Sequence, residues 1–254
     1  MSSSTPPFPP VSLTERRKAE TRMEIARAAA GLFVRQGLKA TRAEDIAQAA
    51  GIAPRTFYRY FAAKEEAVVP LYEAGARRWV EAVRAAPPGT SVPQALEDAV
   101  RSTMRPGAGA SSDSWVRART LIRLAHSNPS LRRVWAEVCQ TSERALAEVL
   151  AARVPVGTAA GDNDAEHADR AAHVDDTDSA DSADSTDSAE RVDGAAVDAR
   201  LRFAAAVAIA AVRVAVEAWA ADDGTGEDPP GPAELAVANL AALRDFPWDA
   251  LTQS

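Results

Sequence analysis

A short stretch in the amino-terminal quarter of the chain carries side chains that can bind nucleic acid. Its polar residues, all within 54–61, are Arg55, Thr56, Tyr58, Arg59 and Tyr60. Hydroxyl and guanidinium groups donate hydrogen bonds to phosphate oxygens, and a guanidinium also pairs with guanine through two hydrogen bonds. On a short helix these side chains would lie opposite an apolar face, which is typical of a helix that reads the major groove of DNA.

Two further helices must hold this stretch in place. Apolar residues at helical spacing predict helices over 14–36 and 41–50, followed by a third over 54–61. Thr41 and Glu44 have the spacing of a capping box, in which both side chains bond free amides where a helix begins. The last two helices are a helix-turn-helix candidate. The core predicted for the three helices is Ile25, Leu32, Phe33, Ile46, Ala47, Ile52, Phe57 and Phe61.

Charge has to be considered region by region. The whole chain has a formal net charge of −7 and a pI of about 5.1, which taken alone argues against a partner as acidic as DNA. Residues 1–64, however, hold eleven basic and five acidic side chains, a net charge of +6. Residues 155–196 hold two basic and twelve acidic side chains, a net charge of −10. The net charge of the whole chain therefore conceals a basic amino-terminal region and one acidic segment.

The acidic segment, at about 156–195, approximates a three-residue repeat of Asp, Ser and Ala without large apolar side chains. Such a composition cannot offset the entropy of ordering the backbone, so we expect a disordered linker. Its acids recur at every third residue, which is not the spacing of a calcium loop. A metal site with His167 or His173, or a phosphorylation site, is the alternative interpretation.

In the rest of the chain the apolar residues recur at helical spacing, and no segment shows the alternation of apolar and polar residues that is typical of a strand. Further helices are predicted over 64–85, 92–104, 113–127, 129–153, 197–221 and 232–245. We expect an all-α protein with a disordered tail over 1–12, a helix-turn-helix domain over 13–66 and a larger helical domain over 67–254, interrupted by the linker. The single cysteine excludes an internal disulfide and a zinc site built on cysteine pairs. With no signal peptide and no membrane-length apolar run, we expect a soluble cytoplasmic chain without a membrane partner.

The run TRAEDIAQAAGIAPRTFYRYFAAKE at 41–65 resembles the DNA-binding signature of TetR-family regulators. The resemblance covers about 14–66 and rests on Asp-Ile-Ala, Ala-Gly, Thr-Phe-Tyr-x-Tyr-Phe and Lys-Glu at the family's spacing. It implies an all-helical homodimer that binds a near-palindromic double-stranded operator, usually as a repressor. It also implies that a small molecule bound in the carboxy-terminal domain releases the DNA.

The resemblance also assigns roles by position. It implies phosphate and groove contacts for Arg42, Thr56, Tyr58, Tyr60 and Lys64, with Arg55 reading a base and Arg59 on the same face. Arg16, Arg17 and Lys18 would add contacts from an amino-terminal arm. Two residues depart from the pattern. Ala53 stands where a capping Ser is frequent, at a cost of about 1 kcal/mol, and Arg42 stands where a Thr is common.

The carboxy-terminal region more loosely resembles the mycofactocin-associated subgroup, whose members are thought to sense acyl-CoA-like molecules. The residues that carry this likeness are RTLIRLAHSNPSLRR at 119–133 and DARLRFAAA at 198–206. It points to an effector that is acyl-CoA-like or otherwise apolar or anionic, and to no cofactor or metal. Helices 197–221 and 232–245 would form the dimer's four-helix bundle, as they do in the family.

Ligand pockets typically have aromatic walls and a few polar groups. On this ground the candidate pocket residues are Trp79, Trp115, Arg119, Arg123, Trp135, Cys139 and Trp219. Their alternative interpretation is ordinary: core tryptophans, a solvated arginine face and a buried thiol. His126, just before a helix break, is expected to cap carbonyls.

No nucleophile–base pair, carboxylate pair or metal cluster supports an enzyme that uses the carboxy-terminal cavity. The alternatives to a ligand-responsive regulator are such an enzyme, and a helical ligand-binding or interaction protein with little DNA binding.

Overall fold

The computed structural model describes residues 12–105, 112–153, 183–222, 230–241 and 244–245, with the backbone alone for 183–198. Within these residues all regular structure is helical, as the sequence predicts. The α-helices are α1 (Leu13–Gln36), α2 (Ala43–Ala49), α3 (Pro54–Tyr60), α4 (Val69–Arg84), α5 (Val92–Thr103), α6 (Ser112–Ser127), α7 (Pro129–Arg153), α8 (Ala183–Ala221) and α9 (Pro232–Ala241). A 3₁₀ turn, η1 (Lys64–Val68), precedes α4.

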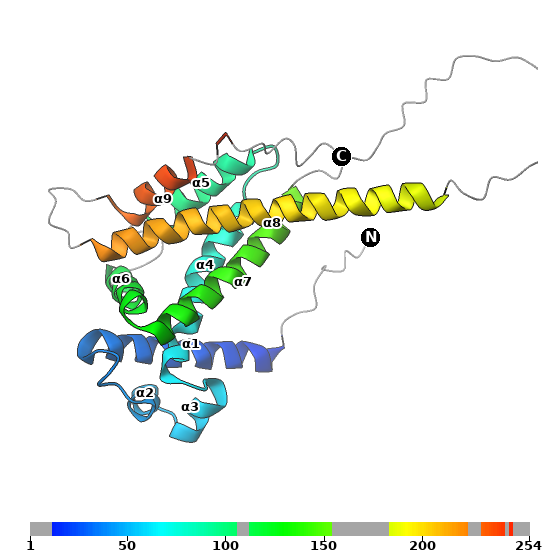
Figure 1. Ribbon diagram of the computed structural model, residues 1–254. Helices are drawn as coiled ribbons and strands as arrows, with labels where there is room; N and C mark the ends of the chain where they lie inside the picture. The colour runs from blue at the N-terminus through cyan, green and yellow to red at the C-terminus, as the bar shows by residue number, and fades with distance from the viewer. Residues whose placement is uncertain (1–11, 106–111, 154–182, 223–229, 242–243, 246–254) are drawn as a thin grey trace, which may run out of the picture.

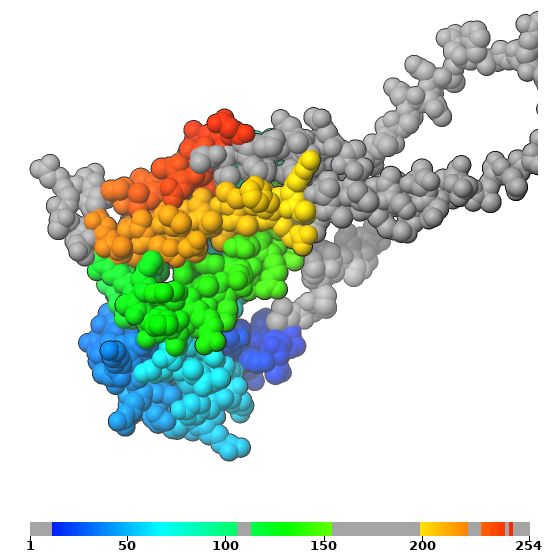
Figure 2. All heavy atoms as spheres, in the orientation of Figure 1, coloured from blue at the N-terminus to red at the C-terminus, as the bar shows by residue number. Residues whose placement is uncertain are grey.

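The helices form a small lower domain and a larger upper one (Figure 1). Helices α1, α2 and α3 lie together at the bottom of the view, and the long α8 crosses the top beside α9 and α5. Helices α4 and α7 pack on each other and run from the lower domain to α8, while α6 contacts α1, α7 and α8. The lower domain is therefore joined to the upper one by packed helices, and the same order appears from blue to red in the space-filling view (Figure 2).

Local sequence signals account for the lower domain. The Ser12 hydroxyl accepts a hydrogen bond from the Glu15 amide and so caps α1. Gly51, in the turn between α2 and α3, has a φ of 68°, a left-handed conformation that glycine adopts without strain. Pro54 occupies the first turn of α3, where its missing N–H would have no helical partner.

The lower domain has its own apolar core, as predicted. Ile25, Ile46 and Phe57 are fully buried, and Phe33 and Phe61 nearly so. The remaining predicted members are buried or partly buried in the same cluster: Leu32, Ala47 and Ile52. Because Phe57 is the buried residue of α3, it fixes which side of that helix faces solvent.

The lower core continues beyond residue 66, where the sequence places the domain boundary. It takes in Val68 and Tyr72 at the start of α4, together with Leu121 of α6 and Leu131 of α7. The upper core is built around α4, α5, α7, α8 and α9. Trp135 contacts both cores, so the two domains share a packed boundary.

The predicted capping box at α2 is displaced by one residue. The helix begins after Arg42, whose amide donates a 2.8 Å hydrogen bond to the Asp45 carboxylate. Thr41 is fully buried instead, and its hydroxyl donates to the Gly37 carbonyl at 2.8 Å. Asp45 therefore caps α2 in place of the predicted Glu44, which leaves the Glu44 carboxylate available to another partner.

Helix α8 begins at Ala183, well before the predicted 197 and inside the segment expected to be disordered. Alanine recurs there, at 183, 189, 195 and 196, and alanine has the highest intrinsic helix propensity. The helix therefore extends into the end of the segment that the sequence assigns to the linker. Residues 156–182 of the predicted linker, and 1–11 of the predicted tail, lie outside the described residues.

One described helix is long and apolar enough to cross a membrane by length and composition alone, contrary to the sequence expectation. It is the part of α8 from Ala199 to Ala221, with a mean hydropathy of 1.7. Along one side it is buried against its neighbours through Leu201, Ala204, Ala208 and Ile209. We therefore interpret this stretch as a helix of the upper core.

Candidate nucleic-acid interface and carboxy-terminal pocket

The exposed side of α3 carries most of the side chains that the sequence selects for DNA contact. Arg55, Tyr58 and Arg59 are exposed, while Thr56 and Tyr60 are half-buried. The guanidinium of Arg59 lies 5.3 Å from the centre of the Tyr60 ring, and part of Tyr60 packs on the lower core. Arg42 is exposed at the start of α2. With Phe57 buried beneath, α3 offers a basic, hydroxyl-rich surface at the bottom of the molecule (Figures 1 and 2).

Ala53 is the residue before α3 and provides no side-chain cap, as its departure from the family pattern implied. The helix is anchored through its aromatic residues instead. The rings of Phe57 and Phe61 lie 5.8 Å apart, and the guanidinium of Arg22 in α1 lies 5.4 Å from the centre of the Phe61 ring. The position of α3 thus depends on packing against α1.

Lys64 has a structural contact that the sequence did not predict. Its half-buried ammonium donates 2.7 Å hydrogen bonds to the carbonyls of Leu38 and Thr41, in the loop between α1 and α2. Two of its three N–H groups are therefore used to hold η1 against that loop. Because the charge stays beside α2 and α3, the structure is compatible with the implied phosphate contact and adds a positioning role.

Glu44 is a residue of this surface that the sequence analysis assigned to another role. The Tyr58 hydroxyl of α3 donates a 3.3 Å hydrogen bond to the Glu44 carboxylate of α2, and both side chains are exposed. The negative charge of Glu44 raises the pKa of Tyr58. Fourteen residues separate the two side chains. Only the turn between the helices brings them together, so neither residue signals the contact by itself.

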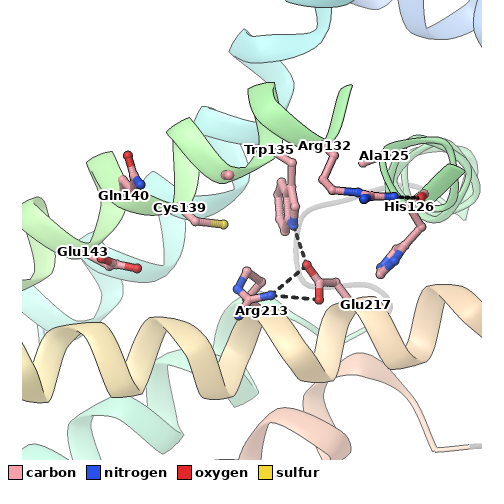
Figure 3. A pocket seen from close by; sticks show the side chains of 10 residues that line it. Ala125, His126, Arg132, Trp135, Cys139, Gln140, Glu143, Arg213 and Glu217 are labelled. Carbon is pink, nitrogen blue, oxygen red and sulfur yellow. Dashed lines mark hydrogen bonds and ion pairs between the residues drawn. The ribbon is translucent and has the colours of Figure 1, made fainter. Parts of the chain in front are cut away.

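The upper domain contains a pocket of about 390 Å³ between α6, α7 and α8. Figure 3 shows its polar centre: the Trp135 indole N–H donates a 2.8 Å hydrogen bond to Glu217, and Arg213 pairs with the same carboxylate at 3.0 Å. The whole lining is Ala125, His126, Arg132, Trp135, Ala136, Cys139, Gln140, Glu143, Arg213 and Glu217.

Trp135 and Cys139 are the two predicted pocket residues that line this pocket. Burial raises the pKa of the Cys139 thiol to about 12, so the thiol is protonated at neutral pH, in line with its interpretation as a buried small side chain. The arginines and glutamates of the lining were not selected from sequence. Their only signal is the four-residue spacing of Arg213 and Glu217 on one helix, which is also common on solvated faces.

The other predicted pocket residues lie elsewhere. Trp79 is buried in the upper core, and its indole lies 3.5 Å from the Leu96 carbonyl. Trp115 packs edge-on against Trp219, with ring centres 5.7 Å apart. Trp79 has the core role that the sequence analysis kept as the alternative, Trp219 packs against the lower core, and the half-buried Trp115 lies beside it.

Arg119 and Arg123 of α6 hold the end of α8. The guanidinium of Arg119 donates to the Asp222 carbonyl, and that of Arg123 donates to the carbonyls of Ala220 and Asp222. The last carbonyls of a helix have no helical partners, so these arginines satisfy groups that would otherwise need water. They are helix caps and do not line the pocket.

His126 was expected to cap carbonyls. Its side chain lines the pocket, and it is the His126 carbonyl that accepts a hydrogen bond, from Arg132 (Figure 3).

Comparisons with known proteins agree with this division of the molecule. The model of the family described as "Bacterial regulatory proteins, tetR family" matches residues 25–68, which end at η1. The HTH-type transcriptional regulator TcmR of Streptomyces glaucescens is 33% identical over 153 residues, which are 59% of this chain and 66% of that regulator. The match thus spans just under two thirds of the relative.

A solved structure shares the fold. FadR of Thermus thermophilus, a TetR-family transcriptional repressor crystallised with lauroyl-CoA, superposes with a TM-score of 0.51 at 19% identity, over 87% of this chain and 92% of FadR. The helix-turn-helix match and the identity to a regulator support transcription regulation over catalysis, and the solved structure shares the all-helical fold. Residues 25–68 thus match the DNA-binding domain of the TetR family, and the chain is similar to DNA-binding transcriptional regulators of that family.

Proposed function

We propose that this chain is a ligand-responsive repressor that binds a near-palindromic operator as a homodimer and is released from it by a small molecule. The observation that carries the proposal is the outward face of α3, where arginine and hydroxyl side chains surround the single buried anchor Phe57. A short helix of this composition fits the major groove, and its twin one DNA turn away, about 34 Å, supplies the affinity that one helix lacks.

Within this proposal the domains take the predicted bounds, with 13–66 binding DNA and 67–254 binding the effector and forming the dimer. Arg55 reads a base, since it is exposed on α3 and a guanidinium pairs with guanine through two hydrogen bonds. Phosphates are contacted by Arg42, Thr56, Arg59, Tyr60 and Lys64. The protein works in the cytoplasm, where its DNA is.

The exposed side of α8 supports dimerisation. Phe203 and Val214 are 58% and 47% exposed, and the eleven residues between them make about three helical turns, which puts both on one side of the helix. Contiguous apolar patches mark interfaces, and we take these two side chains as part of the proposed dimer surface. Together with α9, which packs on α8, this face would form the four-helix bundle with a second copy.

The pocket beside Trp135 and Glu217 is the proposed effector site. We keep the acyl-CoA-like class as the first to test, because the FadR structure that shares this fold was solved with lauroyl-CoA. A volume of about 390 Å³ is near the lower end for ligand sites, so it fits the acyl part of such a molecule, with the nucleotide outside. Arg132, exposed at the pocket, is the cation placed to meet an anionic group.

Calorimetry with acyl-CoA thioesters of increasing chain length tests the effector class. We expect heat of binding and loss of operator binding over the same concentration range. The variant Ala136→Trp fills the pocket from its exposed rim and should abolish both effects. An absence of heat across the whole series, with operator binding unchanged, would sink the acyl-CoA class and leave the DNA-binding proposal standing.

A further inference from the structure

The pair formed by Glu44 and Tyr58 lies on the surface that would meet DNA. Glu44 is in the first turn of α2, and Tyr58 is on the exposed side of α3, with its hydroxyl 3.3 Å from the carboxylate. The Tyr58 ring stands edge-on to the buried Phe57 ring, with centres 5.4 Å apart and an angle of 89° between the rings. Phe57 therefore supports the ring from below, and the hydroxyl end points away from the core.

The hydrogen-bond donors and acceptors of Glu44 and Tyr58 determine what the pair can bind. An ionised carboxylate only accepts hydrogen bonds, so the single O–H of Tyr58 must be the donor to Glu44. The raised pKa of Tyr58 keeps that proton on the phenol at neutral pH. While the Tyr58 O–H is hydrogen-bonded to Glu44, the pair offers oxygen lone pairs to a ligand and no donor.

This hydrogen bond competes with the phosphate contact that the family resemblance implied for Tyr58. A phosphate group on DNA also has acceptors only, so Tyr58 cannot donate to a phosphate while it donates to Glu44. The carboxylate would in addition repel the phosphate. In the major groove, by contrast, cytosine exposes its N4 amino group and adenine its N6 amino group, and both are donors. An acceptor pair beside the basic side chains of α3 is complementary to such an amino group.

We propose that Glu44 and Tyr58 together form a specificity element that accepts a hydrogen bond from the exocyclic amino group of one cytosine or adenine in each half-site. The inference rests on the proposed function, because it requires α3 to enter the major groove. It divides the surface into two kinds of residue: side chains that hold phosphates regardless of sequence, and groups that read bases, namely Arg55 and this pair.

Selection from a random double-stranded DNA library tests this with the full-length chain. We expect the wild-type protein to enrich two half-sites, each with one position held as cytosine or adenine. Exchange to guanine or thymine there should weaken binding by at least about fivefold, the ratio given by the lower end of base-contact energies. The base that is enriched at this position shows whether the pair contacts cytosine or adenine. In both Glu44→Ala and Tyr58→Phe, the ratio of affinities for the preferred and the exchanged base at that position should fall toward one.

Two further measurements separate base selection from general effects. Glu44→Ala should bind non-operator DNA as well as the wild type or better, since one repelling charge is gone. Glu24→Ala removes an exposed carboxylate of α1 and should leave every base preference unchanged. All three substitutions are at exposed sites, and thermal melting will show that the variants are folded.

Three results would overturn the inference. If Glu44→Ala and Tyr58→Phe each select the wild-type sequence with unchanged ratios, the pair has no role in base selection. If Tyr58→Phe weakens binding to all sequences equally, Tyr58 behaves as a phosphate contact. A wild-type chain that enriches no sequence contradicts the proposed function itself, and that outcome is distinct from the first two.

Discussion

The indole N–H of Trp135 donates a 2.8 Å hydrogen bond to Glu217, and this contact joins α7 to α8 on the wall of the pocket. The Trp135 ring also meets the ring of Tyr72 in α4, with centres 5.0 Å apart. Tyr72 in turn donates a 2.9 Å hydrogen bond to the Leu121 carbonyl of α6, which packs on α1. A ligand that draws Glu217 away from Trp135 would therefore act on residues that belong to the lower core.

A double-mutant cycle should detect this contact. Trp135→Phe removes the N–H and keeps an aromatic ring, and Glu217→Ala removes the acceptor. We expect each single variant to lower the free energy of unfolding, with a coupling energy of about 1–3 kcal/mol, as for a hydrogen bond to a charged group. Urea unfolding of the four proteins measures it. Because Arg213 also pairs with Glu217, Arg213→Ala paired with Trp135→Phe is the control. Purely additive changes for Trp135 and Glu217 would contradict the contact.

Cys139 should be unreactive at neutral pH. Its pKa is raised to about 12, mainly by burial, so the nucleophilic thiolate is scarce below that pH. Alkylation by iodoacetamide at pH 8 should be much slower for the folded chain than for the chain in urea. A folded chain that reacts as fast as the unfolded one would show that the thiol is exposed.

The same pKa shift predicts a pH dependence of stability. The unfolded thiol ionises near its ordinary pKa of about 8.5, whereas the folded thiol stays neutral up to about 12. The stabilising contribution is therefore complete below pH 8.5 and declines as the pH rises toward 12. Unfolding at pH 7.5 and 10 should show a smaller loss of stability in Cys139→Ala than in the wild type. Equal losses in the two proteins would contradict the shift.

Ala53 offers a stabilising substitution at the start of α3. Its backbone is extended, with φ −69° and ψ 147°, as a helix-capping residue requires, but it has no side-chain oxygen. Ala53→Ser should supply an acceptor for a free amide of α3 and raise the free energy of unfolding by about 1 kcal/mol. Thermal melting measures the gain, with Ala53→Val as the control that adds bulk without an acceptor. A serine variant no more stable than the valine variant would mean that the cap does not form.

Lys64 is predicted to serve both the fold and the DNA. Lys64→Ala should weaken binding to all sequences and reduce the slope of log affinity against log salt by about one unit, as expected for a lost phosphate contact. It should also destabilise the chain, because the carbonyls of Leu38 and Thr41 lose their charged donor. Lys64→Met keeps much of the alkyl chain and is the matched variant. A lower stability with an unchanged slope would leave Lys64 with the structural role alone.

Local signals in the sequence were sufficient for the lower domain. The apolar spacing that joins Ile25, Ile46 and Phe57, and the helix starts at Pro54 and near Thr41, lie within a few turns of one another. Each constraint acts over a short stretch of chain, so composition and spacing predicted the helices and their core. The shift of the α2 cap from Glu44 to Asp45 shows the limit, since two neighbouring carboxylates satisfy the same pattern and geometry chooses between them.

The pocket was less predictable because its contacts join residues far apart in the chain. Trp135 meets Glu217 across 82 residues, and Arg119 reaches the Asp222 carbonyl across 103. Sequence spacing carries no information about such pairs. A tryptophan in a core and one in a pocket wall also have the same local pattern. Trp115 and Trp219 therefore looked like pocket residues until the fold placed them against each other.

The central claim is that two copies of α3 read one operator, with Arg55 contacting a base. A hydroxyl-radical footprint of the full-length chain on the selected operator tests it most directly. We predict two protected patches on one face of the DNA, about 34 Å or one turn apart, and the loss of both together in Arg55→Ala. A single patch, or protection that Arg55→Ala leaves unchanged, would contradict the account.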